Sequence, residues 1–223
     1  RHRAYEDFEA VARDLVARYV AAVGGERAVT DPRSIRTSGT FEMGGGAVRG
    51  AFVVVQTPTQ TSLTMTIPGL GEMVTAFDGT HGWSVNPMQG PRLLAGAELA
   101  ALREDAGSTG LLRRSPDLVT METVGRTEIE GEACWRVRFV YASGRETADC
   151  YAVESGLLLG SWATQESPMG AVALETRVGE WREFGALRTA TVMRQRAMGQ
   201  EQVLRIERVE FDRADDAAAF APP

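Results

Sequence analysis

The chain has 223 residues, with 30 acidic and 24 basic side chains, two Cys and two His. Every basic residue is Arg, which excludes a Schiff-base Lys and a Lys-containing phosphate loop. The formal net charge of -6 argues against binding nucleic acid, which needs a basic surface, and so few His and Cys cannot form a His-rich metal site or a Cys-based zinc site.

Residues 1–25 are predicted to form an amphipathic helix. Apolar side chains recur at spacings of three and four along residues 8–22, as they do on one face of a helix. The helix is expected to stop at Gly24 and Gly25, because Gly adopts the left-handed conformation without steric cost. One more helical turn is expected over residues 26–29.

Residues 34–93 are predicted to form the first group of strands. Short alternating segments are separated there by Gly, Pro and Asn, which is typical of antiparallel sheet. Residues 62–67 alternate hydroxyl side chains with Leu, Met and Ile, so one face is expected to be buried and the other wet. Residues 44–46, all Gly, are predicted to be a hairpin loop because strands flank them on both sides.

The second half of the chain is predicted to contain one internal helix and a longer series of strands. The helix is expected over residues 95–107, and strands resume over residues 119–212, with one of their turns at residues 168–170. The tail at 213–223, rich in Asp, Ala and Pro, is expected to be a loose strap. No linker or break in composition divides the chain, so residues 1–223 are predicted to be a single domain with about eleven or twelve strands.

These elements predict a mainly β (α+β) fold built on a single large curved antiparallel sheet. Such a sheet covers its apolar face by closing into a barrel or by wrapping around helices. With only two substantial helices as filler, the sheet is expected to leave a cavity, and barrel mouths are favoured ligand sites. The expected apolar wall consists of Phe52, Val54, Leu63, Met65, Ile67, Met73, Trp83, Trp135, Val137, Phe139 and Tyr151. At these positions the sequence does not separate a cavity wall from a packed core.

The two cysteines lie on consecutive predicted strands. If the strand register brings Cys134 and Cys150 to one face, a disulfide is feasible, and an oxidising compartment would allow it. A register one residue away would place them on opposite faces as two buried thiols. The sequence leaves both possibilities open.

Catalytic chemistry has little support in the sequence. His81 and Asp78 form a candidate acid–base pair, but they lie in a predicted turn where Asp commonly bonds nearby backbone. No Gly-x-Ser-x-Gly nucleophile motif is present. We therefore expect a protein that is not an enzyme and uses no cofactor or metal, with a hydrolase-like activity involving His81 as the alternative.

Several segments, taken in order, resemble one known group of proteins. The segments are Tyr-Val-x-Ala-x-Gly-Gly at 19–25, Ser-Gly-Thr-Phe at 38–41, Ile-Pro-Gly-Leu-Gly at 67–71, Phe-Asp-Gly-x-x-Gly-Trp at 77–83, Gly-Glu-Ala-Cys-Trp at 131–135, Ser-Pro-Met-Gly at 167–170 and Val-Glu-Phe-Asp at 209–212. The chain resembles the LolA/LolB/LppX-like superfamily of bacterial outer-membrane lipoprotein-sorting proteins. The resemblance implies an unclosed half-barrel covered by an N-terminal and an internal helix.

The resemblance also implies a function and a location. It implies an exported binding or carrier protein, in the periplasm or envelope of a Gram-negative-type bacterium, that shelters the acyl chains of lipids or lipoproteins in a concave cavity. The chain begins at Arg1 rather than Met, so we expect a mature form without its export signal. No run of 18 apolar residues predicts a membrane-spanning helix. The alternative is a structural or accessory subunit docked on a membrane protein complex.

Overall fold

A computed structural model describes residues 2–165 and 170–223, and most of the turn predicted at 168–170 lies outside the described residues. The strands are β1 (Ile35–Met43), β2 (Val48–Gln56), β3 (Thr61–Ile67), β4 (Gly71–Phe77), β5 (Gly82–Asn86), β6 (Gly90–Leu93), β7 (Leu118–Ile129), β8 (Glu132–Tyr141), β9 (Glu146–Ala152), β10 (Leu158–Gln165), β11 (Val172–Phe184), β12 (Leu187–Ala197) and β13 (Gln200–Phe211). The helices are α1 (His2–Ala22), α2 (Glu26–Thr30), α3 (Gly96–Glu104) and α4 (Gly107–Leu111), with 3-10 turns η1 (Gly44–Gly46) and η2 (Asp216–Phe220).

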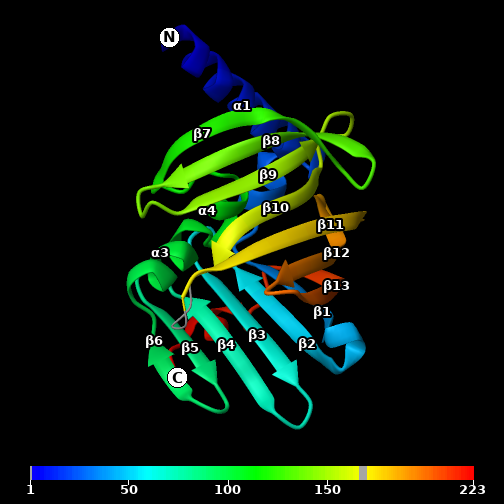
Figure 1. Ribbon diagram of the computed structural model, residues 1–223. Helices are drawn as coiled ribbons and strands as arrows, with labels where there is room; N and C mark the ends of the chain where they lie inside the picture. Colours follow the sequence, from blue (N-terminus) through cyan, green and yellow to red (C-terminus); the bar gives the residue numbers. More distant parts are fainter. Residues whose placement is uncertain (1, 166–169) are drawn as a thin grey trace.

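All the described strands belong to one antiparallel sheet in the order β6-β5-β4-β3-β2-β1-β13-β12-β11-β10-β9-β8-β7. The edge strands β6 and β7 follow each other in the chain but do not pair, so the sheet is unclosed. The segment that joins them carries α3 and α4 and crosses the opening of the curved sheet (Figure 1). We call the side that carries α1, α3 and α4 the concave face, and the opposite side the outer face.

The predicted fold class is confirmed, with two differences in the elements. The described part of the chain forms 13 strands, one more than the upper prediction of twelve, and the additional strand is β6. Strand β6 contains Gly90 and Pro91, which are poor strand formers, and is a strand because it pairs with β5. The predicted internal helix is two helices, because Gly107 breaks it with φ +59°. A Cβ at Gly107 would lie 2.1 Å from the Thr57 carbonyl oxygen, so only Gly fits there.

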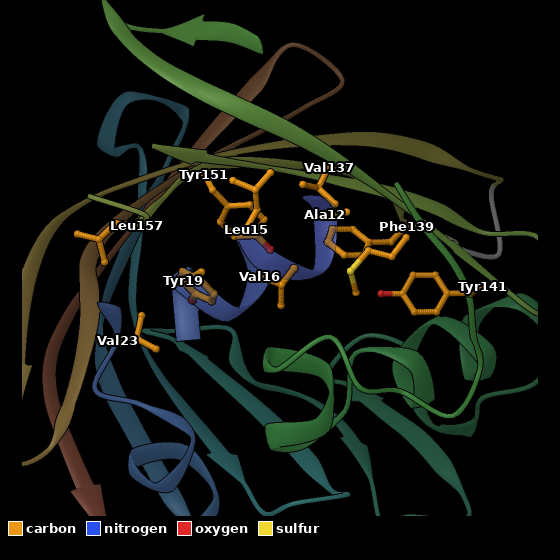
Figure 2. Close-up of a cluster of buried hydrophobic side chains, with 11 residues drawn as sticks. Ala12, Leu15, Val16, Tyr19, Val23, Val137, Phe139, Tyr141, Tyr151 and Leu157 are labelled. Atoms are coloured by element: carbon orange, nitrogen blue, oxygen red, sulfur yellow. The ribbon is translucent and has the colours of Figure 1, made fainter. Parts of the chain in front are cut away.

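Helix α1 packs its apolar stripe against the concave face of β7–β9. Leu15 and Tyr19 belong to one buried cluster with Val137, Phe139 and Tyr151 (Figure 2). The rings of Tyr19 and Tyr151 lie 5.3 Å apart between centroids. This helix therefore fills the part of the half-barrel under β7–β9 with solid core.

The C-terminal tail is not the loose strap that was predicted. It folds as η2 against β3 and β4 and buries Asp216 and Phe220. The Asp216 carboxylate accepts hydrogen bonds from the Ser34 hydroxyl and from Arg36 Nε, the latter at 2.7 Å. A buried carboxylate with two such donors fixes the tail, which the polar composition of the segment did not reveal.

Of the two possibilities for the cysteines, the structure shows the disulfide. Cys134 lies opposite Ala152 in the β8–β9 register, so it is diagonal to Cys150 on the outer face, with 5.5 Å between their Cα atoms. Both cysteines are fully buried beside Ile129 and Trp162.

Loss of this disulfide is expected to lower the free energy of unfolding by about 3 kcal/mol, because the bond closes a loop with a sequence separation of 16. The measurement is urea unfolding of the C134A/C150A double variant against the oxidised wild type. Wild-type protein unfolded in the presence of a reductant serves as the control and should follow the variant. An unchanged midpoint in the variant would contradict the expectation.

Candidate functional site

A central cavity of about 660 Å³ lies between the concave face and the α3–α4 segment. Its volume falls within the range of roughly 300–1,000 Å³ typical of ligand sites. Apolar side chains from both sides form much of its wall: Leu94, Leu102, Leu111, Leu158 and Leu174. The cavity therefore offers an apolar chain a surface sheltered from water.

The charged side chains of the cavity wall are paired with one another. Among the described residues that line the central cavity, three are basic and three are acidic, which gives a net charge of zero. They form the pairs Arg92–Glu98, Arg113–Asp149 and Arg145–Asp105, with shortest N···O distances of 2.7, 2.6 and 2.5 Å. Such a wall does not attract either sign of charge over a long range.

The pair Arg113–Asp149 joins the end of α4 to strand β9. Arg113 donates from Nε and Nη2 to Asp149 at 2.9 and 2.7 Å, and the Tyr151 hydroxyl donates to the same carboxylate at 2.7 Å. The Arg113 guanidinium also lies over the ring of Phe139, 4.6 Å from its centroid. Burial raises the pKa of Tyr19 and of Tyr151, and the nearby Asp149 carboxylate raises both further. These phenols are therefore neutral in the folded protein at ordinary pH.

Arg145 joins the end of α3 to the start of β9. Its Nη1 and Nη2 donate to Asp105 at 3.1 and 2.5 Å, and Nη1 also donates to Glu104 at 3.3 Å. Within residues 2–165 and 170–223, three buried polar atoms at this corner have no hydrogen-bond partner: Arg145 Nε, Thr147 Oγ1 and Glu104 Oε1. Arg145 and Thr147 both line the central cavity.

The eleven residues of the predicted apolar wall lie outside the lining of the central cavity. Six of them lie on β2–β4 and share the concave face: Phe52, Val54, Leu63, Met65, Ile67 and Met73. The pairing row Val54–Leu63–Thr75 connects this group to the cavity, because Thr75 belongs to the lining. The group is therefore an apolar surface next to the cavity on the same face.

The other five predicted wall residues lie elsewhere. Val137, Phe139 and Tyr151 are fully buried beneath α1, and Trp135 packs against that cluster. Trp83 pairs with Ala76, which pairs with Ser62, so it lies on the outer face.

The position of Trp83 corrects the prediction that it shares a face with Leu63. The neighbouring Gly82 faces α3 instead, since a Cβ there would lie 2.9 Å from Leu99 Cδ1. A shift of one residue moves a strand side chain to the other face of the sheet, and alternation within a short strand does not say which face is which.

The polar residues of the cavity were not predicted. The sequence does carry one signal for them, because Thr147 and Asp149 alternate along β9 with Ala148 and Cys150, and all four are buried. Polar residues on a strand that is buried on both faces need partners. Their partner Arg113 lies 36 residues away in the chain from Asp149, so the pairing appears only in the folded structure.

His81 and Asp78 form the turn that was predicted as the alternative to an acid–base pair. Asp78 Oδ1 accepts hydrogen bonds from the backbone N–H groups of Thr80 and His81 at 2.8 and 2.7 Å. These backbone bonds, that of His81 first, lower the pKa of Asp78. The His81 side chain is 70% exposed. Across residues 2–165 and 170–223, no group of three or more His, Cys, Asp or Glu is placed to hold a metal ion.

The unclosed sheet with helices across its opening defines a LolA-like half-barrel. No protein-family model and no curated protein matches the sequence. Among solved structures, the chain is similar to a DUF1329 family protein from Desulfovibrio piger, with a TM-score of 0.64, 12% identity and coverage of 96% of this chain and 97% of that one. It is also similar to a LolA superfamily protein from Nitrosomonas europaea, with a TM-score of 0.61, 10% identity and the same coverage.

A third solved structure, a putative outer membrane lipoprotein-sorting protein domain from Vibrio parahaemolyticus, is similar at a TM-score of 0.61 and 8% identity, with coverage of 96% and 97%. At such low identity these likenesses establish the fold, which is the one that the sequence resemblance implied. No helix among the described residues is long and apolar enough to cross a membrane. The function has to be argued from the site itself.

Proposed function

We propose that this protein is a binding or carrier protein of the bacterial cell envelope that shelters an acyl chain of a lipid or lipoprotein. The observation that carries the proposal is the central cavity, whose leucine-lined wall lies between the concave face and the α3–α4 segment. Each methylene group buried there would contribute about 0.8 kcal/mol to binding. The concave apolar surface of β2–β4 next to the cavity extends the same environment.

Two further observations support the proposal. The Cys134–Cys150 disulfide favours an oxidising compartment such as the periplasm, because disulfides are rare in reducing ones. The turn geometry around His81 accounts for the one candidate acid–base pair without any catalytic role. We therefore propose binding rather than catalysis.

The test is native mass spectrometry of the purified protein, alone and after incubation with fatty acids, monoacylglycerols and phospholipids. We expect a discrete adduct that organic extraction removes. If no lipid of any class binds, the carrier proposal is wrong and a role as an accessory subunit of a membrane complex becomes the better reading.

Filling the cavity should abolish most of this binding. Ala163 on β10 lines the central cavity and pairs with Thr147 on the neighbouring strand β9. We expect A163W to displace two to three methylene groups, which weakens acyl-chain binding roughly 15- to 60-fold at about 0.8 kcal/mol each. Ala51, exposed on the outer face of β2, gives the matched control A51W, which should bind as the wild type does. Equal affinities of A163W and A51W would exclude the cavity as the binding site.

A further inference from the structure

The three guanidinium groups on the cavity wall have little left to offer an anion. Both Nη atoms of Arg92 donate to Glu98. Arg113 donates from Nε and Nη2 to Asp149 and from Nη1 to the Tyr141 hydroxyl oxygen. Both Nη atoms of Arg145 donate to carboxylates at the end of α3. A carboxylate or phosphate headgroup could take a guanidinium fork only by displacing one of these carboxylates into a buried setting, which is costly.

Two polar groups on the same wall are unused. Thr147 is 6% exposed and the Arg145 side chain 10% exposed, and both line the central cavity. Among the described residues, neither Thr147 Oγ1 nor Arg145 Nε has a hydrogen-bond partner that meets the geometric criteria for a hydrogen bond. Arg145 is the residue before β9 and Thr147 is the second residue of that strand, so an N–H donor and an O–H donor lie two positions apart in the chain. An unpaired polar group is costly to bury, and a ligand that supplies an acceptor would recover that cost.

We propose that the central cavity selects an acyl chain with an uncharged head, whose ester or amide carbonyl oxygen accepts hydrogen bonds from Thr147 and Arg145. This inference rests on the proposed function and names the ligand class for the same site. The chain itself would lie along the leucines of the wall, with the carbonyl at the corner where α3 meets β9. A neutral glycerolipid and an acylated protein N-terminus share this chemistry.

The local charges work against an anionic head at this corner. Glu104 is fully buried, its Oε1 has no partner among the described residues, and Asp105 pairs with the same guanidinium. Two carboxylates therefore accompany one Arg, and an additional negative charge would be repelled. A carbonyl oxygen brings an acceptor without bringing a charge.

The first test compares three probes with the same chain by titration calorimetry: monopalmitoylglycerol, a palmitoylated peptide amide and ionised palmitate. We expect at least one neutral probe to bind about 10-fold or more tighter than palmitate, with little dependence on salt. The tighter of the two neutral probes identifies a glycerolipid or an acylated protein as the source. Equal or tighter binding of palmitate overturns the inference but leaves the carrier proposal standing. Failure of all three probes also overturns the inference, and failure of phospholipids as well in the mass-spectrometry test removes the carrier proposal itself.

The second test removes the hydroxyl without disturbing the strand. We expect T147V to weaken binding of the tighter neutral probe about 3- to 10-fold, which corresponds to one hydrogen bond between uncharged groups. Val suits a strand position, so the fold should persist. Thr127 is an exposed residue of β7 that does not line the cavity, and T127V is the matched control, with an expected affinity equal to the wild type. Equal affinities of T147V and T127V would overturn the inference.

Discussion

Replacement of Phe139 by Ala is expected to lower the free energy of unfolding by about 3–5 kcal/mol, which is a large part of the stability of a typical domain. Phe139 lies on β8 and is fully buried beneath α1 (Figure 2). The Arg113 guanidinium lies over its ring. The substitution leaves a cavity in a packed cluster and removes a cation–π contact. Urea unfolding followed by tryptophan fluorescence measures the loss.

The chain offers a matched control on the same helix that covers Phe139. Phe8 lies on the apolar side of α1 but is 51% exposed, because this part of the helix extends beyond the packed cluster. We expect F8A to change the stability by no more than about 0.5 kcal/mol. A loss below about 1 kcal/mol in F139A would mean that the α1–β8 contact is not the core described above.

The architecture could be predicted because it depends on local signals. The alternation of residues within 34–93 and the three glycines at 44–46 predicted strands on both sides of a hairpin loop, and the antiparallel pairing of β1 with β2 around Gly44–Gly46 confirms this. Side-chain period and turn residues act within a few positions, so they can be read in one dimension. The short strand β6 was not predicted, because its local signal, from Gly and Pro, is that of a turn. Only its pairing with β5 makes it a strand.

The division between core and cavity could not be predicted, because it depends on where the helices lie. Phe139 and Leu63 have similar patterns in the sequence, yet α1 covers the first and leaves the second on an open concave surface. Nothing in the strand pattern says which part of a curved sheet a helix will fill. The predicted wall therefore contained residues from three different environments.

The polar side of the site could not be predicted either, because each of its ion pairs joins distant segments or depends on a turn. Arg113 has φ +53°, an unusual conformation for a non-glycine residue, and this brings its side chain from the end of α4 onto β9. Arg145 and Asp105 are separated by 40 residues. In the sequence these residues resemble ordinary solvated charges, and only burial makes them exceptional.

The second large effect is expected at the Arg113–Asp149 pair, which ties the cavity's cover to the sheet. The side chains are 17% and 3% exposed, so removal of the carboxylate leaves a guanidinium buried without a counter-charge. We expect D149A to lower the free energy of unfolding by about 3–5 kcal/mol. Thermal and urea unfolding measure the loss. Relative to the wild type, D149A should increase the hydrogen-exchange rate of α4 more than that of β1.

A second variant separates the cost of an unpaired charge from the cost of lost packing. In R113M/D149L both charges are replaced by apolar side chains, and such replacements are often neutral or stabilising, so most of the lost stability should return. The exposed pair Glu9–Arg13 on α1 is the surface control, and E9A should cost no more than about 0.5 kcal/mol. If R113M/D149L were as unstable as D149A, the loss would come from packing around β9 rather than from an uncompensated charge. The Arg113–Asp149 pair would then hold α4 against β9 by packing and not by its charges.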